Sequence, residues 1–408
     1  MLIQFLQLCF LKLLPPGAAR KRIQKQIYVN VHQHQFQRKK QILVDISVIY
    51  KKDAGTGIQR VVRSVLSELE RNQPADYEIK TVFATTKCNY QYAQQNSKDR
   101  KPIKIVPGDI FLGLDLSAHI LPKHIQQIYG WKRSGANIHI IVYDLLPLKK
   151  PDWFNQKTSE VFRKWIRFVA IYTDSAICIS KTVKNDLDEL LRKKYNISSD
   201  SLPTNTFPLG YELNIGTSSQ GLPENFNNEI NTYRSIPTIL MVGTIEPRKG
   251  YDQVIEAFEL LWERHADAPQ LLIVGKPGWK TERLQQRMLS SKSYGHKLFW
   301  LQNASDEYLS YLYPAAKGII AASYGEGFGL PVLEAAAYDK PILARNIDSF
   351  LEIKVPRLSY FIHTNSTQFS KDIYSWFKKI DKTEEIFTEK KISDWATGTK
   401  KLLELITK

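Results

Sequence analysis

From residue 41 onward, short apolar runs alternate with longer amphipathic stretches, and this rhythm constrains the fold more than any other feature. A short run that is apolar throughout predicts a buried strand, while a longer amphipathic stretch predicts a helix that covers the sheet. Such alternation is typical of βαβ units and of a mainly parallel sheet. We therefore predict strands over residues 42–49, 77–83, 109–114, 137–143 and 176–179, and later over 239–242, 271–274, 298–301, 318–321 and 342–344.

The rhythm breaks once, near the middle of the chain. Residues 214–231 are rich in Gly, Ser, Asn and Pro and poor in large apolar side chains, which is typical of a linker. A length of 408 residues is also long for one hydrophobic core. We predict two Rossmann-like, doubly wound α/β domains that face each other across a cleft. The predicted segments are a basic amphipathic leader (1–40), a first domain (41–213), a linker (214–237), a second domain (238–390) and a closing helix (391–408).

The leader holds half of the net charge of +16, because it contains eight basic side chains and no acidic one. It begins with an apolar run that is too short to span a bilayer, which needs about 20 apolar residues. One interpretation is an interfacial helix whose basic neighbours meet an anionic membrane surface. A flexible basic tail and a helix packed on the body of the protein are the alternatives. The apolar residues at helical spacing are Leu2, Phe5, Leu6, Cys9, Phe10 and Leu13.

Cysteine usage and charge distribution exclude several classes of protein. Cys9, Cys88 and Cys178 are far apart and odd in number, which argues against a disulfide framework or a cysteine metal site. His32 and His34 lie in the basic leader, where we expect a solvated loop and no metal site. Outside the leader the basic residues are scattered without an aromatic-rich motif, so no nucleic acid partner is expected. A reducing, cytoplasmic compartment fits the three thiols best.

A glycine-rich segment over residues 323–337 follows the predicted strand 318–321 and opens a helix. Pro331 stands where the helix begins, a position at which proline loses no hydrogen bond. The glycines let the backbone approach a ligand, and the free amides at the helix start attract an anion such as a diphosphate. Glu326 and Glu334 flank this turn. Carboxylates accept hydrogen bonds from hydroxyl groups, so a sugar and a ribose fit beside the phosphates.

A second segment, residues 241–250, ends the first strand of the second domain. It brings Arg248 and Lys249 to the carboxyl end of the sheet, where ligands of open α/β sheets bind. Two cations at this point can neutralise the charge on a leaving diphosphate. Because they can take the place of a divalent ion, and no Asp-x-Asp pair lies near the glycine-rich segment, we expect no metal and no other cofactor.

These segments resemble the motifs of the retaining glycosyltransferase family 4, whose members have the GT-B fold. Glu326 and Glu334 match the E-x7-E motif of that family, and the segment with Arg248 and Lys249 resembles its donor-phosphate motif. The resemblance implies that Glu326 binds hydroxyl groups of the transferred sugar and that Glu334 binds the nucleotide ribose. Members often carry arginine directly after the first glycine of the second motif. Thr244 stands there in this chain, so phosphate binding rests more heavily on Arg248 and Lys249.

The same resemblance implies further site residues. The loop with Gly57 corresponds to one that faces the donor diphosphate, and Arg60 is a candidate charge partner. Asp144 is a candidate on the acceptor side, and an aspartate that caps a turn is the alternative. Many members have a histidine before this aspartate, where this chain has Tyr143. The other donor-binding residues implied by the resemblance are Gly243, Gly275, Gly327, Phe328, Gly329 and Leu330.

The implied reaction moves a sugar from a nucleotide-diphosphate donor to an acceptor with retention of anomeric configuration. No enzyme nucleophile is needed if the leaving diphosphate guides the acceptor hydroxyl to the same face of the sugar. Residues 244–249 and 143–148 are similar to those of bacterial mannosyltransferases of surface polysaccharide assembly. They predict GDP-mannose as donor and a glycan or lipid-linked glycan as acceptor, reached from the cytoplasm at the inner face of the membrane. A nucleotide-sugar epimerase, a nucleic-acid-binding protein and an inactive scaffold are the alternatives.

Overall fold

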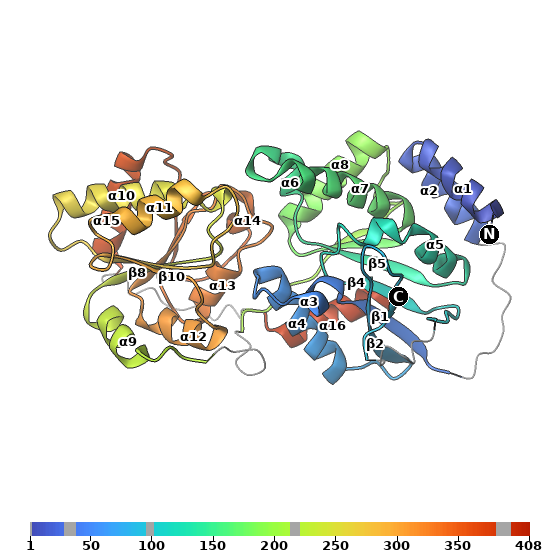
Figure 1. The fold of residues 1–408 in the computed structure, drawn as a ribbon, viewed down its shortest axis with the longest axis horizontal. Coiled ribbons are helices and arrows are strands. Elements are labelled where there is room, and N and C mark those ends of the chain that lie inside the picture. Colours follow the sequence, from blue (N-terminus) through green and yellow to red (C-terminus); the bar gives the residue numbers. More distant parts are fainter. Residues whose placement is uncertain (1, 28–37, 95–101, 213–220, 381–392) are drawn as a thin grey trace. The chain divides into compact units, whose positions relative to one another are not determined.

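The computed structural model describes residues 2–27, 38–94, 102–212, 221–380 and 393–408. The chain divides into two compact units (Figure 1). The first unit comprises Met1–Leu209 together with Trp395–Lys408, and the second comprises Gly210–Asp394. His32 and His34 lie outside the described residues.

The first unit is built on a sheet whose described strands follow the order β3-β2-β1-β4-β5-β6-β7. All neighbours are parallel except β2 and β3, which are antiparallel. The central strands are apolar runs with both faces buried, as expected where helices cover both sides of a parallel sheet. The strands are β1 (Lys40–Asp45), β2 (Tyr77–Phe83), β3 (Gln91–Tyr92), β4 (Ile110–Gly113), β5 (Asn137–Val142), β6 (Ser175–Cys178) and β7 (Thr204–Thr206).

Helices cover this sheet on both faces, as Figure 1 shows. Their first residues follow ordinary capping chemistry: Thr56 precedes α4 and exchanges hydrogen bonds with Gln59 in a capping box. The helices are α1 (Leu2–Leu13), α2 (Pro16–Ile27), α3 (Ser47–Lys51), α4 (Gly57–Arg71), α5 (Ile125–Arg133), α6 (Leu146–Lys149), α7 (Gln156–Tyr172), α8 (Lys181–Tyr195) and α16 (Trp395–Ile406), with short 3₁₀ turns at Leu121–Lys123 and Pro151–Trp153.

The first predicted strand, residues 42–49, was too long at its carboxyl end. β1 stops at Asp45, whose carboxylate accepts hydrogen bonds from the backbone N–H and the hydroxyl of Ser47 at 2.9 and 2.5 Å. This local bonding turns the chain, and α3 begins at Ser47. The apolar run that suggested a longer strand therefore continues as a short helix.

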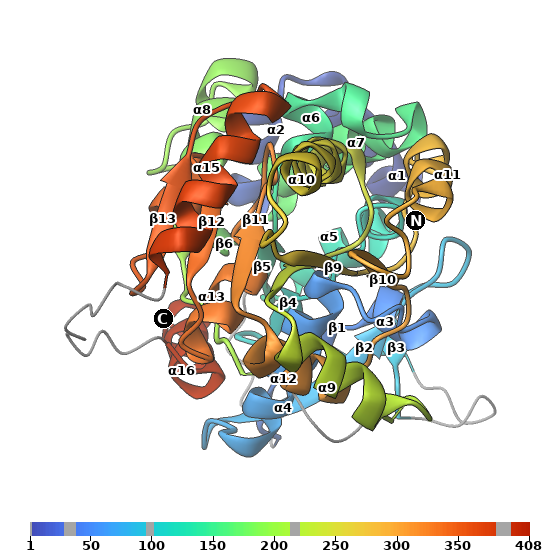
Figure 2. The same ribbon diagram turned by 90° about the vertical axis from the view of Figure 1, so that its left-hand side faces the viewer.

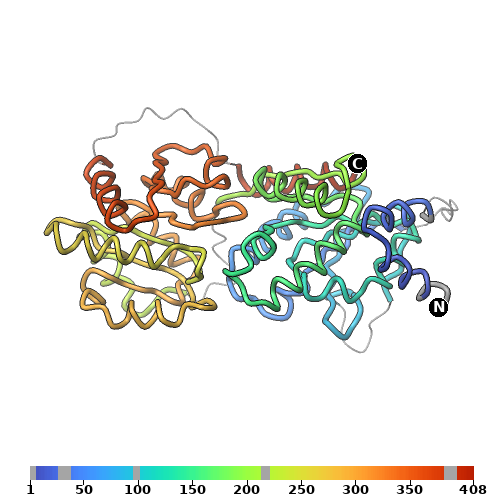
Figure 3. The backbone as a smooth tube through the Cα atoms, turned by 90° about the horizontal axis from the view of Figure 1, so that it is seen from above, coloured from blue at the N-terminus to red at the C-terminus, as the bar shows by residue number. Residues whose placement is uncertain are grey.

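The two N-terminal helices pack against other helices of the first unit (Figure 3). α2 lies against α7, and the Arg20 side chain, which is 3% exposed, donates to the carbonyl oxygens of Ser201 and Thr173 at 2.7 and 2.5 Å. Leu8 and Leu11 bury the inner face of α1. Residues 2–27 of the predicted leader thus form a pair of packed helices, and Lys40 already belongs to β1. In the described part of the chain, every helix is too short or too polar to cross a bilayer.

The second unit contains a parallel sheet whose described strands follow the order β10-β9-β8-β11-β12-β13. With β8 as its first strand, this is the order of a doubly wound nucleotide-binding sheet. The strand order reverses between β8 and β11, so the connections that follow these two strands run to opposite sides. The strands are β8 (Thr238–Val242), β9 (Gln270–Val274), β10 (Leu298–Leu301), β11 (Gly318–Ala321), β12 (Ile342–Arg345) and β13 (Leu358–Phe361).

Two apolar cores, one on each face, hold this sheet between its helices. α10, α11 and α15 cover one face, while α9, α12, α13 and α14 contribute to the other (Figure 2). The helices are α9 (Phe226–Ser235), α10 (Tyr251–Arg264), α11 (Glu282–Ser290), α12 (Asp306–Ala315), α13 (Leu330–Ala337), α14 (Asp348–Leu351) and α15 (Ser366–Lys379), and the short 3₁₀ helix η3 spans Pro247–Lys249.

Part of the stretch predicted as a linker is a helix, and the closing helix belongs to the first unit. Residues 226–235 form α9, which packs against α12 and buries Ile230 and Tyr233 in the core. These two buried residues have mostly polar neighbours in the sequence, so composition alone suggested a linker. α16 returns to the first unit and packs against α4.

Candidate functional site

The predicted donor-binding residues of the second unit lie at the point where the strand order of its sheet reverses. η3 follows β8, and the glycine-rich segment follows β11, so both leave the carboxyl ends of neighbouring strands. In doubly wound sheets this point is the usual ligand crevice, because adjacent connections run to opposite faces of the sheet there. The topology therefore brings together two segments that are 77 residues apart in the sequence.

Gly250 makes the close approach of these segments possible. It has a left-handed φ of 71°, and a Cβ atom at this position would lie 2.4 Å from the carbonyl oxygen of Ala322. The backbone N–H of Tyr324 donates to the carbonyl of Arg248 at 2.8 Å. The backbone of η3 is thus pressed against the start of the glycine-rich segment, and only glycine fits both the conformation and the space.

At the centre of the site, Glu326 is held between two cations. Its carboxylate accepts from Nη1 of Arg248 at 2.5 Å and from Nζ of Lys249 at 2.6 Å. The hydroxyl of Ser323 adds a third bond at 2.6 Å. The three charged side chains are only 11–16% exposed, so these ion pairs are poorly screened by water. Glu246 binds Nε of Arg248 at 2.8 Å and fixes the guanidinium from the other side.

The cations set the charge state of Glu326. Burial by itself would raise the pKa of this carboxyl group, but the positive charges of Arg248 and Lys249 and the hydrogen bonds from Lys249 and Ser323 outweigh burial and lower the pKa to about 2. Glu326 is therefore ionised at neutral pH. It offers an acceptor for hydroxyl groups, while the two cations offer positive charge to phosphate oxygens.

Glu334 lies in α13, one helix turn beyond the glycine-rich turn, and is 1% exposed. The hydroxyl of Tyr313, on α12, donates to its carboxylate at 2.5 Å. Gly329, with a φ of 135°, precedes the helix, and a Cβ atom there would lie 2.7 Å from the Phe350 ring. Among its neighbours in the segment, Gly327 is buried, while Phe328 and Leu330 are partly exposed.

Gly243 and Gly275 follow adjacent strands and touch each other. The N–H of Gly243 donates to the carbonyl of Val274 at 2.9 Å, and a Cβ atom on Gly275 would lie 1.8 Å from the Gly243 carbonyl oxygen. Gly243 itself has a φ of 141°. The hydroxyl of Tyr251 donates to its carbonyl oxygen and ties α10 to this turn. The two glycines therefore keep the ends of β8 and β9 free of side-chain bulk.

Several residues that position the site were missed by motif reasoning. Arg345, 5% exposed, donates to the carbonyl of Ala322 at 3.0 Å and to Gln253 at 2.5 Å, and its guanidinium lies 4.2 Å from the centre of the Tyr324 ring. It thereby anchors the first residues of the glycine-rich segment. Arg345 and Tyr313 belong to no motif or spacing pattern, so they could not be predicted from the sequence. Ser323, in contrast, lies inside the glycine-rich segment that the sequence indicated.

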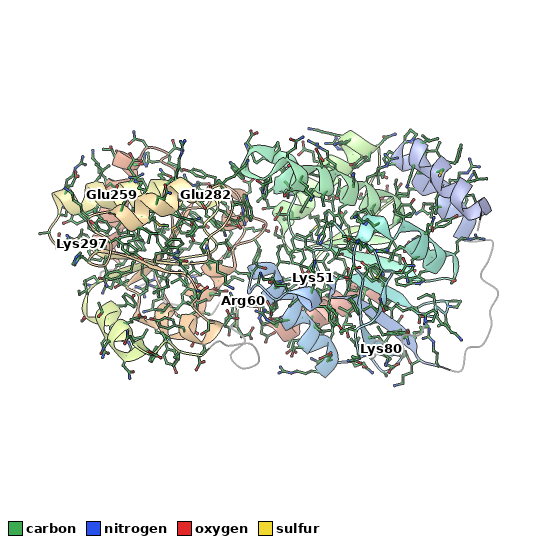
Figure 4. All side chains as sticks on the ribbon, viewed as in Figure 1. Lys51, Arg60, Lys80, Glu259, Glu282 and Lys297 are labelled. Carbon is green, nitrogen blue, oxygen red and sulfur yellow. The ribbon has the colours of Figure 1, made fainter. Side chains whose placement is uncertain are left out.

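The candidate residues of the first unit occupy other positions. Gly57 is the first residue of α4, and Arg60, 8% exposed, projects from the same helix (Figure 4). Asp144 follows β5 and accepts from the N–H of Leu146 at 3.0 Å, a local bond across the turn that precedes α6. The hydroxyl of Tyr143 donates to the carbonyl of Leu114 at 2.6 Å. The Asp144 side chain thus makes the turn-stabilising bond that was the alternative interpretation, and its role on the acceptor side stays a prediction.

The structure thus assembles Arg248, Lys249 and Glu326 into one cluster and brings Gly243 against Gly275. Gly57, Arg60 and Asp144 belong to the other unit. Over the residues that can be described, no group of three or more His, Cys, Asp or Glu side chains is arranged to hold a metal ion.

Two Rossmann-like sheets with a glycine-rich turn of this kind place the chain in the GT-B fold class of glycosyltransferases. The structure of HepE from Anabaena, in complex with UDP and glucose, superposes with a TM-score of 0.62 at 14% identity, covering 91% of this chain and 100% of HepE. WaaG, a glycosyltransferase involved in lipopolysaccharide biosynthesis, gives a TM-score of 0.56 at 15% identity, covering 90% of this chain and 99% of WaaG. At these identities the likeness concerns the fold.

Sequence comparison then identifies the family. Residues 224–393 match the model of the glycosyl transferases group 1, and this part of the chain belongs to that family. The serotype-specific mannosyltransferase WbdA of Escherichia coli is 36% identical over 347 residues, which are 83% of this chain and 41% of WbdA. The O-antigen chain mannosyltransferase B of Escherichia coli is 35% identical over 114 residues, 28% of this chain and 30% of that protein. The chain spans about two fifths of the length of WbdA.

Proposed function

We propose that the chain transfers a hexose, mannose from GDP-mannose, to a glycan or lipid-linked glycan with retention of anomeric configuration. The observation that supports this most is the cluster of Arg248, Lys249 and Glu326 at the switch point of a group 1 domain. It pairs cations for a diphosphate with a carboxylate for sugar hydroxyls. The relatives named as mannosyltransferases support the choice of sugar.

In the proposed reaction, the bond between the anomeric carbon and the phosphate oxygen breaks, and its electron pair stays on the diphosphate. Arg248 and Lys249 stabilise this growing charge. The acceptor hydroxyl forms the new bond on the face that the diphosphate leaves, and its proton passes to a phosphate oxygen. Glu326 orients the sugar by accepting from its hydroxyl groups, and Glu334 holds the ribose. From the first unit, Gly57 and Arg60 are proposed to bind the donor, and Asp144 is proposed to bind the acceptor.

A panel of nucleotide sugars tests the donor. The protein is incubated with GDP-mannose, UDP-glucose, UDP-galactose and UDP-N-acetylglucosamine, and release of the nucleoside diphosphate is measured with and without a mannose-terminated acceptor. We expect acceptor-dependent turnover with GDP-mannose above all. The anomeric configuration of the product, read by NMR, must match that of the donor. Turnover only with a UDP sugar would contradict the donor assignment, and inversion would contradict the mechanism.

Substitution of the two cations tests the mechanism. Arg248→Ala and Lys249→Ala should each lower kcat more than they raise the donor KM, because the charge on the leaving group grows in the transition state. Lys292→Ala, an exposed residue outside the site, is the matched control. If a chelator abolishes turnover while both alanine variants stay active, a metal ion carries this role instead.

We also propose that the chain works in the cytoplasm, peripherally bound to the anionic inner face of a membrane. The outer side of α1 supports this, because Leu6, Phe10 and Leu13 are 59, 44 and 84% exposed. The guanidinium of Arg22, on α2, lies 4.7 Å from the Phe10 ring and so places a cation beside the apolar stripe. The other exposed basic residues of this surface are Lys12, Lys21 and Lys25. Such a surface combines apolar burial with about 1 kcal/mol of attraction per basic residue at an anionic membrane.

Vesicle sedimentation tests this surface. The wild-type chain should sediment with vesicles that contain anionic lipid, less with neutral vesicles, and less again as salt is raised. Phe10→Ser with Leu13→Ser should weaken binding. Leu289→Ser with Ile362→Ser, at exposed apolar positions of the second unit, should not. Equal recovery with both vesicle types, or none with either, would leave α1 as a packed structural helix.

A further inference from the structure

A groove of about 450 Å³ lies in the second unit between α9 and the edge strand β10. It includes Tyr294 and Gly295, which precede β10, and so reaches the amino end of that strand. The donor cluster follows the carboxyl ends of β8 and β11 instead. None of the residues that line the groove belongs to the donor site described above.

The wall of the groove carries hydrogen-bonding groups next to aromatic surface. Glu229 accepts from the hydroxyl of Tyr308, and the exposed amides of Asn225 and Asn228 stand on the same side. Tyr294 and Phe299 are partly exposed and offer ring surface. A small number of polar groups on an apolar floor is the usual construction of a site for a small or flexible ligand.

Tyr233 forms part of this wall and is 3% exposed. Within the described residues its hydroxyl has no hydrogen-bond partner, although it belongs to a buried side chain. Burial above all, and then the charge of Glu229, raises the pKa of this hydroxyl above its ordinary value, so it remains a donor. The hydroxyl oxygen is not among the buried unpaired atoms and so is open to the groove, where a bound ligand with hydroxyl groups can pair with it.

The lining excludes anionic ligands. It contains the carboxylate of Glu229 and no lysine, arginine or histidine. A phosphate or a nucleic acid backbone would find no positive charge there and would be repelled by that carboxylate. Amides, a carboxylate and a phenol hydroxyl instead match the alternating donors and acceptors of sugar hydroxyls, and the ring faces match the C–H surface of a pyranose.

We propose that this groove is a carbohydrate-binding subsite, separate from the donor site, that holds a neutral oligosaccharide. Its volume suits one or two sugar units, with the rest of the oligosaccharide running along β10. Binding here keeps a saccharide chain on the second unit without any part in the chemical step. The proposal does not depend on the identity of the donor.

Oligosaccharide titration tests the proposal. Pentasaccharides of mannose, glucose and N-acetylglucosamine are titrated into the full chain in the presence of saturating GDP, and binding is followed by saturation-transfer NMR and calorimetry. At least one should bind. Tyr233→Phe combined with Asn228→Ala should raise its Kd about tenfold, because two hydrogen bonds are lost. Asn227→Ala, on the same helix but outside the groove, should leave the Kd unchanged.

Two outcomes would overturn the proposal: no pentasaccharide binds, or the groove variant binds as tightly as the wild type. Hydrolysis of the nucleotide sugar, measured on the same variants, should be unchanged because the groove lies outside the donor cluster. A chain that hydrolyses no nucleotide sugar but binds the pentasaccharide through the groove would contradict the proposed transferase and leave the subsite standing.

Discussion

The carboxylate of Glu326 neutralises part of the positive charge of Arg248 and Lys249, and this has consequences for ligand binding. Each cation that contacts Glu326 is also a candidate partner for a phosphate oxygen. In the proposed reaction, the donor diphosphate competes with the carboxylate for the same two side chains. The carboxylate is then free to accept from sugar hydroxyls when the cations bind the phosphates. The ion pairs are largely buried and poorly screened by water. Replacing them by contacts with a phosphate therefore changes the free energy of ligand binding appreciably.

Glu326→Gln separates these two roles. Loss of the charged acceptor should reduce kcat/KM for transfer by about 10- to 100-fold, the range expected for a hydrogen bond to a charged group. Binding of GDP alone should tighten, since Arg248 and Lys249 no longer share their charge with a carboxylate. Calorimetry with GDP and steady-state kinetics measure the two effects. Glu263→Gln, an exposed site on α10, is the control and should change neither. Weaker GDP binding in Glu326→Gln would contradict the competition.

The dependence of the unfolding free energy on pH, between pH 5 and pH 2, tests the same ion pairs. The pKa of Glu326 is lowered from its ordinary value of 4.5 to about 2. A carboxyl group with a depressed pKa stabilises the fold fully above its unfolded pKa and loses that contribution as the pH falls toward the folded pKa. From pH 5 to pH 2 the wild type should lose about 3 kcal/mol of unfolding free energy that Glu326→Gln does not lose. Denaturant titrations at each pH measure the difference, and parallel pH profiles would show that the cations do not hold the carboxylate.

At the scale of elements, the site depends on how closely η3 approaches the end of β11. Gly250→Ala adds a Cβ atom 2.4 Å from the Ala322 carbonyl oxygen at a φ of 71°, so the backbone must shift. We expect a loss of about 1–3 kcal/mol in unfolding free energy and a displaced glycine-rich segment with weaker donor binding. Gly295→Ala has a similar φ of 79° with no atom within 4 Å of the added Cβ.

The comparison of these two alanine variants isolates the steric contact from the cost of the left-handed conformation. Thermal unfolding and GDP titration are the measurements. If Gly295→Ala is as damaging as Gly250→Ala, the close approach to Ala322 does not control the site.

At the scale of the whole molecule, the chain crosses between the two units twice. It leaves the first unit after Leu209 and returns to it at Trp395. α16 then completes the first unit: Leu402 and Ile406 are 0 and 2% exposed, and a Cβ atom on Gly398 would lie 2.2 Å from the Pro208 carbonyl oxygen. The last helix in the sequence therefore belongs to the core formed by the first half of the chain.

Leu402→Ala should consequently destabilise the first unit and leave the second unit unaffected. Truncation of a fully buried leucine costs about 2–5 kcal/mol. Leu403→Ala, at a partly exposed position of the same helix, should cost less. Hydrogen exchange followed by mass spectrometry assigns the loss of protection to each unit. Equal loss of protection in α10 and α4 would show that α16 stabilises both units.

Much of this organisation could be predicted from local sequence. Period and run length located the parallel strands, because a strand buried on both faces must be apolar throughout, and this requirement is local. Glu326, Arg248 and Lys249 were found for a similar reason: glycines, a helix-starting proline and strand-end cations each leave a mark in the few residues around them.

Other features could be identified only from the tertiary structure. Arg345 and Tyr313 support the site through contacts with residues 23 and 21 positions away, and α16 packs beside a helix from the far end of the chain. α9 was hidden because two buried side chains, Ile230 and Tyr233, suffice to hold it once α12 is in place. In each case the free energy comes from a partner distant in the sequence, so no local pattern records it. The sequence by itself determined the strand pattern and the positions of the glycine-rich segment and of the Arg248–Lys249 pair, because these features are local. The tertiary structure decided which distant side chains support them.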